Sequence, residues 1–291
     1  MNENDNKFPD FVTFGRTFEN YKWYKPLLTL IVSMVLFLVF QLILVAVFSI
    51  IYGQDIITGI AMGGYETLNK SDAFSYFSYL GIAVFLPALY LSCKIVNYRP
   101  FSSYSSSRGG WNLKLYLKCL IIPVIVYVVV TAISIAIGFE KGDGNVHVSA
   151  IALVVCLILI PLQCISEEYL FRGILMQTFG SWFKIPIIAI ILQSVCFLIL
   201  HPYNVIGMIT IGFSGIVLGL MAWRTSGLEA GSAIHSINNL ASFYTVSLGV
   251  GSLSSNVTVG SAFEDICATL ISALLLYYIG NKKGWFDPKT D

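Results

Sequence analysis

Long runs of apolar residues alternate with short polar segments along this chain, and the length of the runs predicts helices that cross a membrane. A helix needs about 20 mostly apolar residues to span the hydrocarbon core of a bilayer. About eight runs approach that length, at roughly 26–52, 73–95, 113–138, 148–165, 184–203, 204–223, 228–249 and 262–280. The pattern is typical of an all-α, polytopic membrane protein with about eight transmembrane helices.

The composition supports a lipid environment. Hydrophobic residues make up 56% of the 291 residues and charged residues 11%, which is far from the balance of a water-soluble domain. The formal net charge of +1 gives no basic field of the kind that attracts nucleic acid. We therefore expect membrane lipid, and not nucleic acid, as a partner.

The basic residues predict the orientation, because Lys and Arg are retained on the cytoplasmic side of a membrane. With an even number of spans, all but Lys70 and Lys141 of the 17 Lys and Arg residues fall on the side of the two termini. We therefore expect a multi-pass protein of the cell membrane. Its N-terminal tail, residues 1–25, and its C-terminal tail, residues 281–291, are both expected to be cytoplasmic.

A charged cluster follows the fourth apolar run, at Ser166-Glu167-Glu168-Tyr169-Leu170-Phe171-Arg172. A charged residue deep in a membrane helix costs about 2.5 to 3.5 kcal/mol on insertion scales, so two adjacent carboxylates there need partners or a function. Glu168 and Arg172 are four residues apart and share a helix face. Glu167 is rotated by about 100° from Glu168 and can point elsewhere.

Two of the 3 histidines lie in later apolar runs. His201 ends the sequence Phe197-Leu198-Ile199-Leu200-His201, and His235 is followed one helical turn later by Asn239. A single buried histidine is more often an ordinary core residue. Two of them, with an asparagine and a glutamate pair in the same half of the chain, indicate a functional site.

These groups suit the hydrolysis of a peptide bond, which needs a base that activates water and donors that stabilise the oxyanion. Two imidazoles and a carboxylate are also a common ligand set for zinc, so Glu167, His201 and His235 are candidate ligands of a Zn²⁺ ion. A rhomboid-like serine protease is another alternative, because Gly212-Phe213-Ser214-Gly215 matches Gly-x-Ser-Gly. The same glycines also suit close packing of membrane helices.

Together the motifs resemble those of the CPBP family, the CAAX proteases and bacteriocin-processing enzymes that are also called the Abi family. The family pattern is Glu-Glu-x-x-x-Arg, then Phe-x-x-x-His, then His-x-x-x-Asn or Asp. It stands here as Glu167 to Arg172, Phe197 to His201 and His235 to Asn239. The resemblance covers residues 148–280, a catalytic transmembrane core, whereas the three N-terminal helices in residues 26–147 match only in being hydrophobic.

The resemblance implies an intramembrane endopeptidase of glutamate or metallo type. In such an enzyme Glu167 with His201 activates water, while His235 and Asn239 stabilise the oxyanion or help to hold a metal. Eukaryotic relatives cleave the last three residues from prenylated CAAX proteins, and bacterial members are associated with bacteriocin immunity and peptide-pheromone processing. We therefore expect a peptide or protein substrate of one of these kinds, reaching the site from the cytoplasmic side.

Two functions without proteolysis are also compatible with the cluster. A membrane scaffold or a bacteriocin-immunity protein could use it to hold helices together, and Glu168 and Arg172 would then be structural. Buried acids and histidines also mark the proton relays of transporters. That alternative is weaker, because the two halves of the chain carry no corresponding pair of broken spans.

The predicted boundaries place the candidate residues at different depths. Glu167 follows the fourth run near the cytoplasmic face, whereas His201 lies at the far end of the fifth. A shared site requires different boundaries. We expect the fourth helix to continue through the glutamate pair towards Thr178, and Pro202 to break the chain after His201, because half-spans are tolerated where they line a polar cavity.

Overall fold

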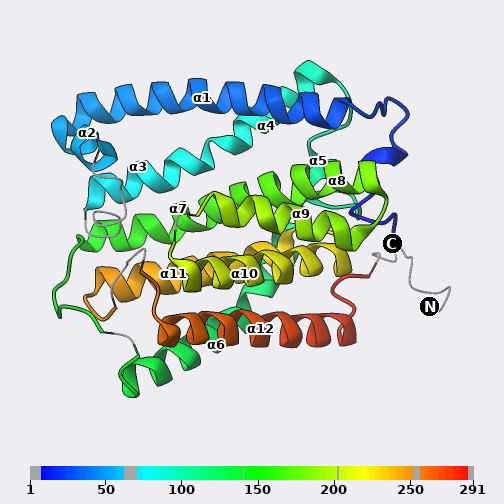
Figure 1. Ribbon diagram of the computed structural model, residues 1–291. Coiled ribbons are helices and arrows are strands. Elements are labelled where there is room, and N and C mark those ends of the chain that lie inside the picture. Colours follow the sequence, from blue (N-terminus) through cyan, green and yellow to red (C-terminus); the bar gives the residue numbers. More distant parts are fainter. Residues whose placement is uncertain (1–7, 62–70, 140, 202, 252–255, 288–291) are drawn as a thin grey trace.

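The computed structural model describes residues 8–61, 71–139, 141–201, 203–251 and 256–287. Within these ranges every named element is helical, and the long helices lie alongside one another in a bundle (Figure 1). The layer of α1, α3 and α4 forms one side of the bundle, and α6 and α12 form the opposite side. The predicted all-α class is confirmed.

The helices agree in place with the apolar runs of the sequence, but they are more numerous than the runs. In chain order they are η1 (Phe14–Thr17), α1 (Lys25–Tyr52), α2 (Gln54–Ala61), α3 (Asp72–Ala83), α4 (Phe85–Val96), α5 (Ser102–Ser105), α6 (Leu113–Ala136), α7 (Ala150–Glu168), η2 (Tyr169–Leu175), α8 (Met176–Phe183), α9 (Pro186–Ile199), α10 (Val205–Arg224), α11 (Glu229–Ser247) and α12 (Val259–Lys282). Each predicted run overlaps at least one of them.

Six helical segments among the described residues are long and apolar enough to cross a membrane. They are Lys25–Tyr52, Asp72–Val96, Leu113–Ala136, Ala150–Phe183, Val205–Arg224 and Val259–Lys282. The α9 helix is apolar but shorter, and α11 carries more polar residues along its length. The chain is therefore a multi-pass membrane protein, and the count of eight spans stays a prediction.

The fourth span is much longer than its apolar run, and the predicted end at residue 165 is wrong. The run Ala150–Phe183 is helical for 34 residues, through a π-helical segment, η2, that begins directly after Glu168. The expected continuation towards Thr178 is confirmed. The helix passes through the charged cluster because those side chains find partners inside the bundle, and it ends where Lys184 adopts a left-handed conformation, with φ 60°.

The fifth predicted run is correct in place but wrong in length. The α9 helix has 14 residues, which corresponds to a rise of about 21 Å and is shorter than the hydrocarbon core of about 30 Å. Its end therefore lies within the thickness of the bundle, and His201 follows directly after it. This short helix resolves the conflict of depth between His201 and Glu167. The predicted break at Pro202 lies outside the described residues.

The described part of the N-terminal tail packs against the bundle. Phe11 and Val12 are fully buried, and Arg16 donates a hydrogen bond of 2.8 Å to the carbonyl oxygen of Ser181 in α8. A Cβ atom on Gly180 would lie 2.2 Å from the carbonyl oxygen of Val12, so the segment approaches α8 as closely as a glycine allows. Residues 8–24 thus cover one end of the helices, the end at which α12 also finishes (Figure 1).

Candidate active site

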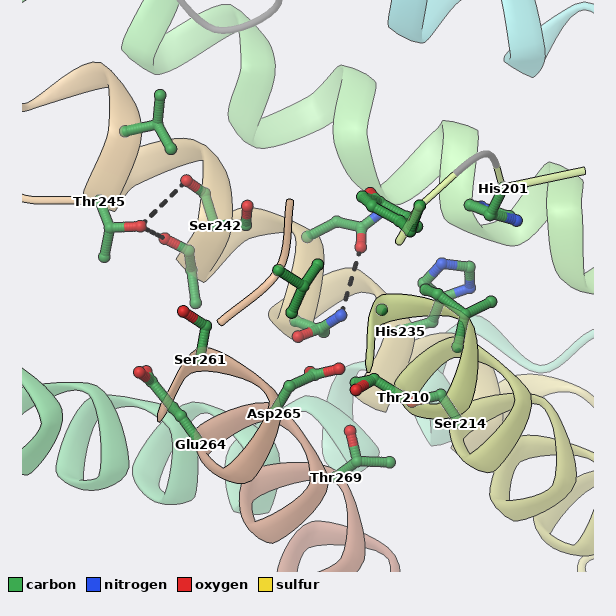
Figure 2. Close-up of a pocket in the computed structure, with 18 of the residues that line it drawn as sticks. His201, Thr210, Ser214, His235, Ser242, Thr245, Ser261, Glu264, Asp265 and Thr269 are labelled. Carbon is green, nitrogen blue, oxygen red and sulfur yellow. Dashed lines mark hydrogen bonds between the residues drawn. The ribbon is translucent and has the colours of Figure 1, made fainter. Parts of the chain in front are cut away.

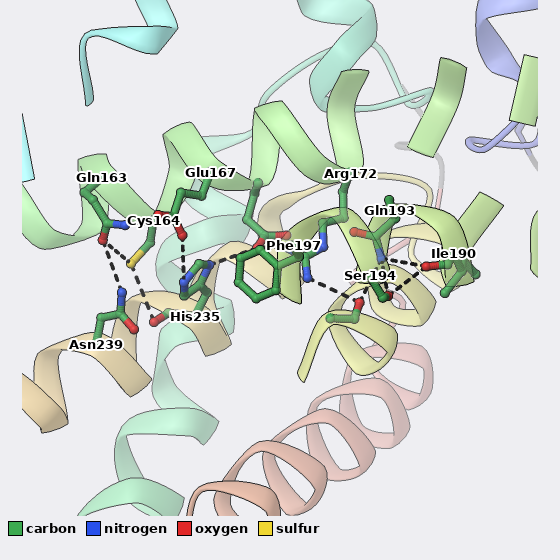
Figure 3. A network of polar contacts seen from close by, with 12 residues as sticks. Gln163, Cys164, Glu167, Arg172, Ile190, Gln193, Ser194, Phe197, His235 and Asn239 are labelled. Carbon is green, nitrogen blue, oxygen red and sulfur yellow. Dashed lines mark hydrogen bonds and ion pairs between the residues drawn. The ribbon is translucent and has the colours of Figure 1, made fainter. Parts of the chain in front are cut away.

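The charged cluster at the end of α7 is almost completely buried. Glu168 and Arg172 are 0% exposed, and Nη1 of Arg172 donates a hydrogen bond of 2.8 Å to Oε1 of Glu168 (Figure 3). Nη2 of Arg172 donates to the carbonyl oxygen of Gly215 in α10 at 3.2 Å. The predicted pairing of Glu168 with Arg172 is therefore present, and it connects α7 and η2 to α10.

His235 lies between the two adjacent glutamates. Its Nδ1 is 2.9 Å from Oε1 of Glu168, and its Nε2 is 3.4 Å from Oε2 of Glu167. The imidazole is 6% exposed and Glu167 9%. The structure thus brings together four of the six predicted site residues, namely Glu167, Glu168, Arg172 and His235.

Phe197 connects this group with the second histidine. The guanidinium of Arg172 lies 4.6 Å from the centre of the Phe197 ring. That ring meets His235 edge to face at 6.0 Å, and His201 at 4.6 Å. The spacing from Phe197 to His201 therefore has a physical role, because the aromatic ring lies between the two imidazoles.

His201 is held by its own helix end. Its Nδ1 lies 2.7 Å from the carbonyl oxygen of Phe197, which favours a hydrogen on Nδ1 and an acceptor lone pair on Nε2. The ring is nearly parallel to that of Tyr203, with 6.3 Å between their centres. Among the described residues, His201 forms no hydrogen bond or ion pair with Glu167 or Glu168. It lines the same pocket as Glu167.

Asn239 is positioned by a residue that the sequence analysis missed. Nδ2 of Asn239 donates a hydrogen bond of 3.2 Å to Oε1 of Gln163, which is 4% exposed. Gln163 is one helical turn before Glu167, so the two share a face of α7. A glutamine within an apolar run is the signal that could have singled it out.

A cavity of about 510 Å³ joins the candidate residues. Glu167, His201, His235 and Asn239 are all part of its wall, whereas Glu168 and Arg172 are not. Figure 2 shows the two histidines in this wall. The wall continues to Thr258, which is exposed at the start of α12. The pocket therefore reaches the end of the bundle opposite residues 8–24.

This direction differs from the expected approach of the substrate. If the termini are cytoplasmic, as the Lys and Arg residues predict, the end of the bundle that carries Thr258 is the outer one. Glu167 does not lie at the cytoplasmic end of its helix, because the helix continues to Phe183.

The serine-protease alternative finds no catalytic pair in the described residues. Ser214 lines the pocket, but its hydroxyl oxygen is buried without a hydrogen-bond partner. Both ring nitrogens of His235 face glutamate oxygens instead. Ser214 thus lacks the base that a serine nucleophile requires.

Side chains that could bind a metal ion are dispersed in the described part of the chain. Among the described residues, no three His, Cys, Asp or Glu side chains are grouped so that they could hold one. A Zn²⁺ ion held by Glu167, His201 and His235 stays a prediction from the sequence. No step of the proposed reaction uses a metal.

The fold and the site together define a helical membrane protein with a glutamate and histidine pocket inside the bundle. Residues 149–241 match the family model described as "Type II CAAX prenyl endopeptidase Rce1-like". This segment contains all six predicted site residues. The resemblance predicted from the motifs is confirmed: this segment is similar to the CAAX-type membrane proteases of the CPBP family.

A search of curated proteins gives one relative. The chain is 26% identical over 176 residues to the uncharacterized protein YyaK of Bacillus subtilis (strain 168). The matched part amounts to 57% of this chain and 58% of that protein. No solved structure matches the chain significantly.

Proposed function

We propose that this protein is an intramembrane endopeptidase in which Glu167 activates a water molecule. The observation that carries the proposal is the position of Glu167, 3.4 Å from His235 and in the wall of a cavity large enough for water and an extended peptide. A carboxylate next to an imidazole in a partly dry pocket is a suitable general base. The family match of residues 149–241 supports a CAAX-type membrane endopeptidase.

The reaction begins when the Glu167 carboxylate accepts a proton from water. The water oxygen attacks the carbonyl carbon of the peptide bond and a tetrahedral oxyanion forms. The C–N bond then breaks, and the proton held by Glu167 passes to the leaving nitrogen. Nε2 of His201, which is an acceptor when Nδ1 carries the hydrogen, is suited to orient the water.

Two side chains are suited to stabilise the oxyanion. The side-chain amide of Asn239 donates to Gln163 and also lines the pocket, so it is suited to donate to an oxyanion there. His235 donates from Nδ1 to Glu168 and, when protonated, can also donate from Nε2. Donors that are already held in place stabilise the developing charge without reorganisation.

Glu168 and Arg172 act as supports in this proposal, because neither lines the pocket. Glu168 neutralises the buried guanidinium and orients the imidazole of His235. We propose a prenylated CAAX-type, peptide-pheromone or bacteriocin-type peptide as the substrate, by analogy with the activities of the family. The cell membrane is the proposed location, with both termini in the cytoplasm.

A cleavage assay on reconstituted protein tests the proposal. Purified protein in liposomes is incubated with a farnesylated CAAX peptide and with a mixture of unprenylated decapeptides, and products are identified by mass spectrometry. We expect cleavage by the wild type and by Ser214→Ala, and none by Glu167→Gln. Glu167→Gln is nearly isosteric, so unchanged turnover in this variant refutes the proposal, and loss in Ser214→Ala alone favours a serine protease.

The alternative of a non-catalytic immunity or scaffold protein is supported by the hydrogen bonds that join different helices. Gln193 in α9 and Arg172 in η2 both donate to the carbonyl oxygen of Gly215 in α10. A bacteriocin-protection assay in cells separates the two functions. Protection that survives Glu167→Gln supports the scaffold, whereas loss of protection with normal expression supports the peptidase.

A further inference from the structure

A second pair of adjacent carboxylates lies in the same pocket, opposite the proposed catalytic group. Glu264 and Asp265 occupy the second turn of α12, and both contribute to the wall that Glu167 and His235 line. In Figure 2 the side chain of Asp265 points from α12 towards Thr210 and Ser214 of α10. Neither residue belongs to the family motifs described above.

The two carboxylates have unused acceptor atoms. The hydroxyl of Thr131 donates to Oε1 of Glu264 at 2.7 Å, but Oε2 of Glu264 is buried without a hydrogen-bond partner. Oδ1 of Asp265 is also buried without a partner. An unsatisfied buried acceptor destabilises the folded protein. A pair of them that faces a cavity therefore indicates a ligand that satisfies both.

The charges around the pocket favour a cation as that ligand. Three carboxylates line it, those of Glu167, Glu264 and Asp265, whereas no described lining residue is a Lys or an Arg. The imidazole of His235 lies between Glu167 and Glu168, on the other glutamate pair, and not at Glu264 or Asp265. A concave surface of one sign in a medium of low dielectric constant attracts and selects ligands of the opposite sign.

We propose that Glu264 and Asp265 form a subsite that binds a Lys or Arg side chain of the peptide substrate. The inference rests on the proposed peptidase function. An ammonium or guanidinium group carries several N–H donors and no acceptor, so it can satisfy both unpaired oxygens at once. The pocket wall includes the exposed Thr258, so the chain of a peptide can pass from solvent along α12 to the glutamates.

The subsite is tested with two matched peptides and the wild-type protein. Pairs of decapeptides are synthesised that differ only in having Lys or norleucine at one position, and the position is varied along the peptide. Norleucine keeps the four-carbon side chain of Lys and lacks the ammonium group. We expect kcat/KM to be at least about tenfold higher for Lys at one position, since a buried charge pair contributes that much or more. Equal cleavage of Lys and norleucine peptides at every position overturns the proposal.

Variants of the carboxylates show which residues give the preference. In Asp265→Asn and in Glu264→Gln the ratio of kcat/KM for the Lys and norleucine peptides is expected to fall towards one. Glu19→Gln, a change at an exposed glutamate far from the pocket, is expected to keep the wild-type ratio. A ratio that is unchanged in both carboxylate variants overturns the proposal even if the wild type prefers Lys.

A binding measurement distinguishes failure of the subsite from failure of the peptidase function. Fluorescently labelled Lys and norleucine decapeptides are titrated onto Glu167→Gln protein, which cannot turn them over. Tighter binding of the Lys peptide, lost in Glu167→Gln/Asp265→Asn, supports the subsite even if no cleavage is ever seen. Equal binding of the two peptides overturns the subsite, whatever the outcome of the cleavage assay.

Discussion

Nδ1 of His235 lies 2.9 Å from Oε1 of Glu168, and this contact gives two neighbouring glutamates different environments. The same oxygen of Glu168 accepts a hydrogen bond from Arg172, so its charge is neutralised within the protein. Glu167 has only the longer contact with His235 and faces the pocket. Glu168 is therefore suited to hold His235 and Arg172 in place, and Glu167 is suited to act as the base in the pocket.

Removing each charge in turn is expected to separate these two roles. Glu167→Gln should abolish cleavage and change the free energy of unfolding by about 1 kcal/mol or less, because no buried charge loses its partner. Glu168→Gln should destabilise the protein by about 3 to 5 kcal/mol, because Arg172 stays buried without a counter-ion. Thermal unfolding in detergent and peptide turnover measure the two effects.

A double variant provides the control for this pair. Replacing both partners, in Glu168→Gln/Arg172→Met, removes the unpaired charge and is expected to recover much of the lost stability. If Glu167→Gln and Glu168→Gln proved equally destabilising, the assignment of separate roles would be wrong.

Asn239→Ala is expected to reduce kcat by about 10²- to 10³-fold and to leave KM nearly unchanged, as the loss of an oxyanion donor does. Gln163→Ala should have the same effect on kcat in weaker form, since Gln163 acts only by holding Asn239. Steady-state kinetics on a single peptide measures both. A rise in KM with normal kcat in Asn239→Ala would assign this residue to substrate binding instead.

Chelation tests the zinc alternative. Because the described His, Cys, Asp and Glu side chains form no group suited to a metal ion, we expect dialysis against EDTA and 1,10-phenanthroline to leave turnover unchanged. Metal analysis of the purified protein accompanies the assay. Loss of activity that returns when Zn²⁺ is added would instead show that the histidines and Glu167 move together to ligate the ion.

The helices could be predicted from the sequence because burial in lipid requires long apolar runs, however the helices pack against one another. The glutamate pair and the histidines were recognisable for the related reason that polar groups in such runs are costly. Their mutual contacts were not predictable. Neighbouring residues on a helix point about 100° apart, and only the position of α11 lets one imidazole face both Glu167 and Glu168.

Other features depend on packing that no local pattern records. Charged residues that follow an apolar run mark the end of a membrane helix when their side chains are solvated. Glu168 and Arg172 instead pair with each other inside the bundle, and the helix continues to Phe183. In the sequence, Glu264 and Asp265 do not stand out as site residues, because carboxylates near the N-terminus of a helix are commonly stabilised by the helix dipole. Their exposure to the pocket follows only from the place of α12 beside α10.

The contact between the N-terminal segment and α8 is expected to depend on Gly180. In Gly180→Ala the new methyl group would lie 2.2 Å from the carbonyl oxygen of Val12, so the segment has to move, at a cost of about 1 to 3 kcal/mol. Gly212→Ala is the matched control, because its nearest atom would be 4.0 Å away. Limited proteolysis should cut the N-terminal segment faster in the first variant only, and equal rates would contradict the close contact.

The orientation of the pocket is decided by which end of the bundle faces the outside of the cell. Val259 is 72% exposed next to the pocket residue Thr258, and Lys282 is exposed at the other end of the same helix. If the positive residues mark the cytoplasm, a membrane-impermeant maleimide should label Val259→Cys in intact cells, and Lys282→Cys only after permeabilisation. The parent protein sets the background, because its free cysteines are buried or partly buried. The opposite labelling pattern would place the mouth of the pocket in the cytoplasm, where a prenylated CAAX substrate would meet it, whereas the expected pattern favours the pheromone-type and bacteriocin-type peptides among the proposed substrates.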